Sequence, residues 1–115
     1  MKHNGINIHI DRKDYSEVVH TIDASSLNFY EYVHGGIYYS LADAAAGVSS
    51  RSDGNNYVTI NSSFNYMKAV KKGVLKACAT VVSRTTRLCV VNVNVLNEDE
   101  EIVSQGSFTM YRVTI

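Results

Sequence analysis

The sequence has no proline, no tryptophan and only two cysteines among its 115 residues. Cys78 and Cys89 both stand in strand-like runs, and their spacing matches no pattern of metal ligands. Buried, reduced thiols are therefore favoured over a disulfide framework or a zinc site. The four histidines are scattered and do not cluster as metal ligands would. We predict neither a metal site nor a bound cofactor.

The sequence also lacks an excess of charge of either sign and any long apolar run. Eleven basic residues balance eleven acidic ones, so no overall field would draw the protein to nucleic acid or to an anionic membrane surface. The first residues, MKHNGINIHI, lack the apolar segment of a signal peptide, and no run approaches the roughly 18 apolar residues of a membrane span. We expect a cytoplasmic protein with no nucleic-acid or membrane partner.

Hydrophobic residues make up 45% of the chain, and no linker or internal repeat interrupts it. A chain of this length can form one domain with a modest core, which association with further copies would help to stabilise. We therefore predict a single domain over residues 1–115 and an oligomer.

Alternation of apolar and polar residues predicts strands before and after one helical segment. These runs lie at about residues 6–11, 15–23, 57–67, 74–83, 88–96 and 102–115. In the third run the alternation places Thr59 on a polar face and four apolar side chains on the other face, namely Val58, Ile60, Phe64 and Tyr66. Short turns separate the later runs, which predicts antiparallel meander pairing.

Between the second and third strands, residues 33–50 predict a His-Gly-Gly turn followed by one buried helix. Apolar residues recur there at helical spacing and most positions between them are small; the recurring set is Ile37, Leu41, Ala44, Ala45 and Val48. The turn-forming run SSRSDGNN predicts that the helix ends near residues 49–53. Gly35 and Gly36 leave backbone N–H groups accessible at the helix N-terminus, which is a ready site for an anion.

Asp43 is the one acid on this helix. Burying a lone carboxylate is costly, so Asp43 must be paired, hydrogen-bonded or functional. One interpretation is a structural aspartate held by a neighbouring hydroxyl, from Ser40 or Tyr39, and the other is a catalytic carboxylate. One long buried helix and five or six strands predict an α+β fold in which a curved antiparallel sheet wraps around the helix.

The chain carries a combination of residues that is more specific than the glycine turn alone. It comprises Asn28, His34-Gly35-Gly36, Asp43, Val58-Thr59, Phe64, Val70, Gly73 and Gln105-Gly106-Ser107-Phe108. Over about residues 5–112 this pattern resembles the PaaI-like branch of the hotdog-fold acyl-CoA thioesterases, in the 4-hydroxybenzoyl-CoA thioesterase superfamily. Glu31 departs from the family pattern, because many members have glycine there, and this departure bears on substrate preference.

The resemblance implies an enzyme that hydrolyses an acyl-CoA thioester to a free acid and coenzyme A. Gly35 would donate its backbone N–H to the thioester carbonyl, and Asp43 would act as general base or as nucleophile. Asn28 would orient the thioester or the attacking water, and Thr59 would hold that water. Ordinary loop-capping and strand roles are the alternatives for Asn28 and Thr59. The alternative function is a non-catalytic hotdog module that binds an acyl thioester or a protein partner.

Further residues would bind the substrate around this centre. His34 and Gly36 belong to the turn that would receive the thioester, where we expect His34 to shape the turn by a local hydrogen bond. Coenzyme A carries phosphates, so basic side chains should flank the mouth of the site, and the candidates are Lys71, Lys72, Arg84 and Arg87. Solvated charged turns are the alternative explanation for these four residues.

Distance along the helix predicts that two subunits share each site. Gly35 and Asp43 are eight residues apart, which corresponds to roughly 12 Å at about 1.5 Å per residue. One bound carbonyl carbon cannot meet both groups of the same helix. If two helices lie antiparallel about a two-fold axis, Gly35 of one subunit faces Asp43 of the other. We therefore expect a homodimer with two shared sites. A dimer of such dimers is also expected, although the distance along the helix does not choose between a dimer and a tetramer.

Overall fold

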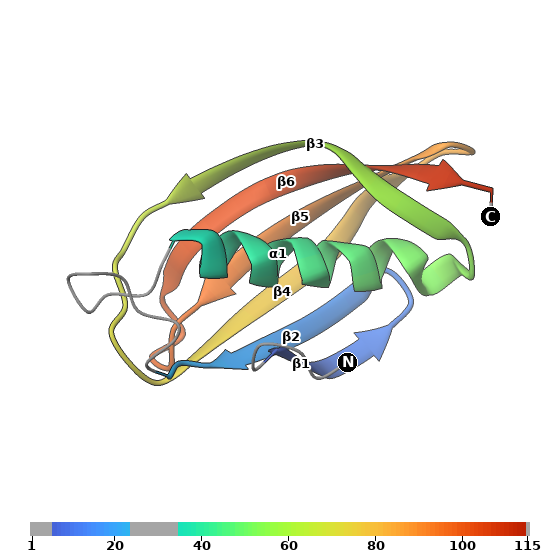
Figure 1. Cartoon of the computed structure of the whole chain (residues 1–115). Coiled ribbons are helices and arrows are strands. Elements are labelled where there is room, and N and C mark those ends of the chain that lie inside the picture. The colour runs from blue at the N-terminus through green and yellow to red at the C-terminus, as the bar shows by residue number, and fades with distance from the viewer. Residues whose placement is uncertain (1–5, 24–34, 115) are drawn as a thin grey trace.

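The computed structural model describes residues 6–23 and 35–114, and these residues form a helix, a short 3₁₀ turn and six strands (Figure 1). In chain order the elements are β1 (Ile6–Arg12), β2 (Tyr15–Thr21), α1 (Gly35–Ser50), η2 (Arg51–Asp53), β3 (Asn56–Tyr66), β4 (Val74–Arg84), β5 (Leu88–Leu96) and β6 (Ile102–Val113). These bounds agree closely with the predicted helix and strands. No helix in the described part of the chain is long and apolar enough to cross a membrane.

All six strands belong to one antiparallel sheet in the order β1-β2-β4-β5-β6-β3. The sheet curves around α1, which lies in its hollow (Figure 1), and this arrangement confirms the predicted hotdog fold. The meander expected over β4, β5 and β6 is present. Pairing between β3 and β4 was also expected and is wrong, because β3 lies at the far edge beside β6. Residues 67–73 carry the chain past β6 and β5, a path that short connections alone do not predict.

The core forms where α1 packs against the concave face of the sheet. Leu41, Ala42, Ala45 and Ala46 are fully buried, and the three alanines let the helix approach the sheet closely. The buried side chains of the sheet include Val18, Leu75, Ala77, Val91, Val93 and Phe108. This packing fixes the height of α1 above the sheet.

Two buried serines fix the position of α1 along the sheet. Ser16 Oγ of β2 donates to the carbonyl oxygen of Ala45 at 2.9 Å. Ser49 Oγ of α1 donates to the carbonyl oxygen of Ala79 in β4, also at 2.9 Å. Because both bonds are buried, they hold the second half of the helix against two neighbouring strands.

The side of α1 that faces away from the sheet is less buried than predicted. Asp43, Ala44 and Val48 are half-buried and lie on the wall of a cavity. The prediction of a helix buried nearly all round is therefore wrong for the single chain. Small apolar residues suit a closely packed face and a cavity wall equally well, so their spacing does not distinguish the two.

A β-bulge in β3 changes which side chains face the helix. Thr59 pairs with Met110 and Asn61 with Thr109, which leaves Ile60 as an extra residue. Thr59, before the bulge, points towards α1. Ser62, after the bulge, also points towards α1, and its Oγ shares a hydrogen bond of 2.8 Å with Tyr39 Oη.

Val58 and Ile60 consequently lie on the other side of β3, where they are 46% and 55% exposed. Phe64 packs against the Tyr39 ring on the helix side, with ring centroids 5.5 Å apart. The predicted common face for Val58, Ile60, Phe64 and Tyr66 is therefore wrong, because strict alternation does not allow for the inserted residue.

The cysteines are structural. Cys89 is buried, Cys78 is half-buried, and both are free thiols. Burial raises the pKa of each thiol above its ordinary value, which disfavours the reactive thiolate. These residues therefore contribute packing in β4 and β5 rather than chemistry.

Candidate functional site

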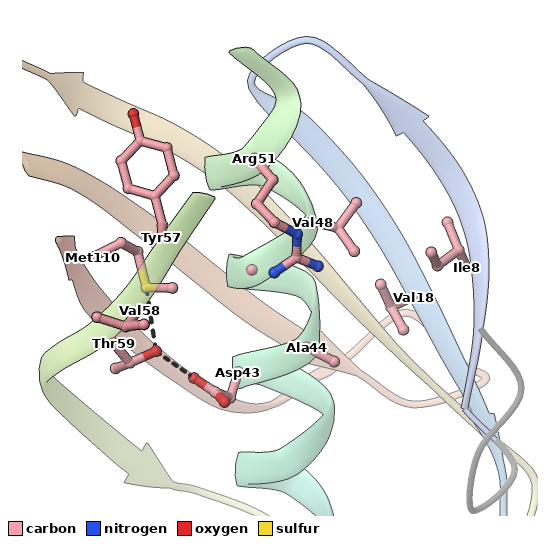
Figure 2. Close-up of a pocket in the computed structure, with 11 residues that line it drawn as sticks. Ile8, Val18, Asp43, Ala44, Val48, Arg51, Tyr57, Val58, Thr59 and Met110 are labelled. Atoms are coloured by element: carbon pink, nitrogen blue, oxygen red, sulfur yellow. Dashed lines mark hydrogen bonds between the residues drawn. The ribbon is translucent and has the colours of Figure 1, made fainter. Parts of the chain in front are cut away.

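Asp43 lies in the middle of α1 and points towards β3 (Figure 2). Its carboxylate oxygen Oδ1 accepts a hydrogen bond from Thr59 Oγ1 at 2.8 Å. The partners considered from the sequence do not hold it in this way: the Tyr39 hydroxyl is bonded to Ser62, and Ser40 is exposed. The carboxylate is thus half-buried and oriented by a residue from another element.

Asp43 and Thr59 lie on the wall of a cavity of about 420 Å³. The other lining residues come from β1, β2, α1, η2, β3 and β6; they are Ile8, Val18, Ala44, Gly47, Val48, Arg51, Tyr57, Val58 and Met110 (Figure 2). Most of these side chains are apolar, and the carboxylate and hydroxyl are near one another. Such a cavity suits a ligand with an apolar chain and one reactive polar group.

The β3–β6 pairing and the bulge together aim Thr59 at the helix. Thr59 is the last paired residue before the bulge, opposite Met110, and its Oγ1 lies 3.3 Å from Met110 Sδ. A bulge beside a functional group commonly re-aims a side chain. Here the result is a hydroxyl directed at the Asp43 carboxylate.

Gly35 begins α1 at the end of the helix opposite η2. The first N–H groups of a helix have no partner within the helix and carry its positive dipole end. A Cβ at Gly35 would lie 3.3 Å from the Tyr66 ring, whereas Gly36 has open space around it. The structure does not bring Gly35 to Asp43 within one chain. Asn28 and His34 lie outside the described residues.

The basic residues chosen from the sequence lie away from this cavity. Lys71 and Lys72 are exposed in the connection between β3 and β4. That connection lies beside the first turn of α1, because the Tyr38 hydroxyl donates to the carbonyl oxygen of Lys68 at 2.9 Å. The two lysines are therefore at the Gly35 end of the helix, and neither lines the Asp43 cavity.

Arg84 belongs to a half-buried network instead of an open mouth. Its Nη2 donates to Asp14 Oδ1 at 2.7 Å, and its Nη1 donates to Asp53 Oδ2 at 2.9 Å and to the carbonyl oxygen of Ser50 at 3.0 Å. Two carboxylates neutralise its charge, and both terminal nitrogens are occupied. The geometry therefore argues against the predicted contact between Arg84 and a phosphate.

The same network shifts the pKa of its members. Burial alone would raise the pKa of Asp53, but hydrogen bonds from Tyr57 and Asn55 and the charge of Arg84 outweigh it and lower that pKa to about 2. Burial and the hydrogen bond to Asp53 raise the pKa of Tyr57. Asp53 is thus ionised and Tyr57 neutral throughout the physiological range, as a structural ion-pair network requires.

Sequence reasoning missed several residues of the cavity. Arg51 stands eight residues after Asp43 and Gly47 stands between them, so all three share one helix face. This spacing was a usable signal for Arg51. Ile8 and Met110 reach the cavity through strand pairing and sheet curvature, for which the local sequence carries no signal.

The family model described as Thioesterase superfamily matches residues 30–104 of the chain. The chain belongs to this superfamily. One relative, a candidate esterase of Archaeoglobus fulgidus, is 32% identical to the chain over 103 residues. The match covers 89% of this chain and 67% of the relative.

Solved structures extend the likeness to the whole fold. The thioesterase-superfamily chain matches PaaI of the Escherichia coli phenylacetic acid degradation operon with a TM-score of 0.93 and 25% identity, over 96% of this chain and 81% of that one. It matches smu.793 of Streptococcus mutans, bound to acetyl CoA, with a TM-score of 0.89 and 32% identity, over 94% and 88% of the two chains. The chain is therefore a PaaI-like hotdog protein.

A third structure bears on the site residues. A hypothetical thioesterase of Streptococcus pneumoniae solved with coenzyme A has a TM-score of 0.90 and 33% identity, over 94% of this chain and 85% of that one. Variants of the pneumococcal protein with one aspartate or one threonine replaced by alanine have also been solved, and those two positions are 16 residues apart. Asp43 and Thr59 have the same separation of 16 residues.

Proposed function

We propose that this protein is an acyl-CoA thioesterase that hydrolyses an acyl-coenzyme A to the free acid and coenzyme A. The observation that carries the proposal is the half-buried Asp43 carboxylate, which Thr59 orients at the wall of an apolar cavity. Structures of similar proteins with acetyl CoA or coenzyme A support the choice of substrate class. The nature of the acyl group is left open.

Asp43 would supply the chemistry of the attack. In one form of the reaction it removes a proton from water while the water oxygen bonds to the thioester carbonyl carbon. In the other form its own oxygen attacks, and water then hydrolyses the anhydride. In both forms the C–S bond breaks, the sulfur leaves with its electron pair, and protonation gives free coenzyme A.

The negative charge on the carbonyl oxygen requires a donor that Asp43 does not provide. A backbone N–H at the start of a helix suits this task, because the helix dipole adds to the hydrogen bond. Gly35 of the same chain is eight residues away along α1, roughly 12 Å. We therefore assign this role to Gly35 of the partner subunit, with Asn28, His34 and Gly36 on the same side of the shared site.

The free edge of the sheet offers a surface for the second copy. β3 is an edge strand in the described sheet, and its Val58, Ile60 and Tyr66 side chains are 46%, 55% and 55% exposed. Exposed apolar edges favour pairing with another chain. In such a dimer Lys71 and Lys72, which lie at the Gly35 end, would approach the mouth of the partner subunit's cavity, so they remain proposed phosphate ligands.

Replacement of the carboxylate tests the function. Asp43→Asn keeps the size of the side chain and removes its charge, so free-thiol release from a panel of aliphatic and aromatic acyl-CoAs should fall by about 10²–10⁴ in kcat. Circular dichroism and the oligomer mass should be unchanged, because Asp43 contributes no core packing.

Asp99→Asn provides the matched control, since Asp99 is an exposed acid in the turn after β5. A kcat for Asp43→Asn within a few-fold of the control would exclude a catalytic Asp43. If the wild-type protein bound acyl-CoA without releasing thiol, the alternative of a non-catalytic binding module would replace the enzyme.

A further inference from the structure

A second groove continues from the Asp43 cavity towards the end of α1. Its volume is about 470 Å³, and it lies between the tip of the β1–β2 hairpin and the η2 turn. Ile8, Val48 and Arg51 line both the cavity and this groove. The two spaces are therefore neighbours along one face of the helix.

The groove is lined by more positive than negative side chains. Arg12, Lys13 and Arg51 face a single acid of its lining, Asp11. Arg12 is held over the Tyr15 ring, with Cζ 4.8 Å from the ring centroid. Within residues 6–23 and 35–114, no acid forms an ion pair with Arg12, Lys13 or Arg51. Their charges are available to an anionic ligand.

Glycine at position 47 lets Arg51 lie at the junction of the two spaces. A Cβ at Gly47 would lie 2.9 Å from Arg51 Nη1, so the guanidinium rests against the bare helix backbone. Figure 2 shows the Arg51 side chain extended back along α1 towards Ala44 and Asp43. This position puts a planar cation with several donors between the cavity and the groove.

The two walls of the groove are tied together beneath it. The Asp14 N–H at the hairpin tip donates to Ser52 Oγ of η2 at 2.8 Å. Arg84 then bridges Asp14 of the hairpin and Asp53 of η2 at 2.7 and 2.9 Å. Arg84 offsets one of these two negative charges, and neither acid lines the groove. The ties hold the walls apart at a fixed distance before any ligand binds.

We propose that this groove binds the phosphate groups of the coenzyme A portion of the substrate through Arg12, Lys13 and Arg51. The inference rests on the proposed function, because it takes the thioester to be at Asp43. The rise of α1 from Asp43 to Arg51 is roughly 12 Å, a distance that an extended pantetheine arm spans. Arginine pairs with phosphate through parallel donors, which suits the presented guanidinium groups.

The test is the affinity for coenzyme A, measured by calorimetry on the full chain. A triple variant with Arg12→Gln, Lys13→Gln and Arg51→Gln should raise the Kd by about tenfold or more. Arg51→Gln alone should give part of that loss and provides a readout if the triple variant is unstable. Lys76→Gln, in β4 and outside the groove, is the matched control and should leave the Kd unchanged.

Two further measurements test the same inference, one with added salt and one with a substrate that lacks the phosphates. Raising the salt concentration should weaken coenzyme A binding in the wild-type protein and have a smaller effect in the triple variant. The kcat/KM for an acyl-CoA should fall in the triple variant, whereas that for the same acyl-pantetheine, which has no phosphates, should be retained.

An unchanged Kd in the triple variant would overturn the inference, and so would a wild-type protein that does not bind coenzyme A. A larger loss in a Lys71→Gln, Lys72→Gln double variant than in the triple variant would also overturn it, because these two lysines rather than the groove would then bind the phosphates. If coenzyme A binds through the groove but neither thioester is hydrolysed, the groove stands and the proposed enzyme function fails.

Discussion

Thr59 gives the Asp43 carboxylate its direction. The hydroxyl donates at 2.8 Å from β3, the strand that follows the helix after the η2 turn. The donated hydrogen bond holds one carboxylate oxygen in place, and Asp43 lines the cavity. Thr59 therefore acts as a positioning residue for Asp43, and its oxygen lone pairs can also accept a hydrogen bond from water.

Substitution of Thr59 separates positioning from simple packing. Thr59→Val preserves the branched shape and removes the hydroxyl, so kcat should fall by about tenfold, the effect of losing one hydrogen bond to a charged group. The KM should change little, because the substrate-binding walls remain. Thr59→Ser restores the hydroxyl and should recover most of the activity. Equal activities for the valine and serine variants in a thiol-release assay would show that the hydroxyl plays no part.

The residues of the site differ in how far the sequence reveals them. Asp43 stands out because it is a lone acid on an apolar helix, and Gly35 because it opens that helix. One of the two interpretations of Asp43 gave it a nearby hydroxyl as partner, whereas the structure shows the Thr59 hydroxyl there. Helical neighbours are visible in a sequence, whereas a contact across 16 residues depends on strand pairing and on the bulge after Thr59.

At the scale of elements, α1 and β3 show why the bounds of the helix and strands were easier to predict than the face on which each side chain lies. The alternating runs and the apolar helix define the elements, and their bounds agree with the structure. The extra residue Ile60 reverses the faces of β3, and a one-residue shift moves every later side chain to the other side. The order of the strands was also missed at β3, because an edge position depends on the path of residues 67–73.

Arg84 joins three elements, namely β4 and the two walls of the basic groove. It links β4 to the β1–β2 hairpin through Asp14 and to η2 through Asp53. Removing Arg84 would leave both carboxylates without their counter-ion, and removing Asp53 would leave Arg84 with Asp14 as its one remaining acidic partner in the described part of the chain. The sequence shows a basic residue at a turn and gives no sign of this role, because its acidic partners are 70 and 31 residues away.

The free energy of unfolding at acid pH tests the ion pair between Arg84 and Asp53. The pKa of Asp53 is about 2 in the folded protein, below its value of about 3.9 in an unfolded chain. The stabilisation by its carboxylate is therefore complete above about pH 5 and is lost as the pH falls towards 2. Asp53→Asn should lower the free energy of unfolding at pH 7 by about 2 kcal/mol, and its stability should vary less between pH 5 and pH 2.

Urea unfolding of the two proteins across this pH range makes the measurement. Asp99→Asn, at an exposed acid, should follow the wild-type curve. Parallel curves for Asp53→Asn and wild type would mean that Asp53 does not stabilise the folded state through its charge.

At the scale of the whole molecule, one chain carries the groups needed for the proposed reaction at two separate places along its helix. Asp43, Thr59 and the basic groove lie along the second half of α1, and Gly35 lies at its start. A two-fold arrangement with antiparallel helices would bring the start of one helix to the middle of the other. It would also cover the half-buried outer side of α1, where Ala44 and Val48 line the cavity of the single chain.

Mixed dimers test this arrangement directly. An Asp43→Ala chain and an Asn28→Ala chain should each be inactive alone, with Asn28 taken from the family resemblance and placed on the Gly35 side. If they are refolded together, random mixing makes about half of the dimers mixed, and each mixed dimer has one intact and one doubly damaged site. Roughly a quarter of the wild-type activity should then return. Thiol release measures the recovery, and native mass spectrometry confirms the mixed dimers. If mixed dimers form and stay inactive, Asn28 and Asp43 must act within one chain, and the sharing of sites between subunits is wrong.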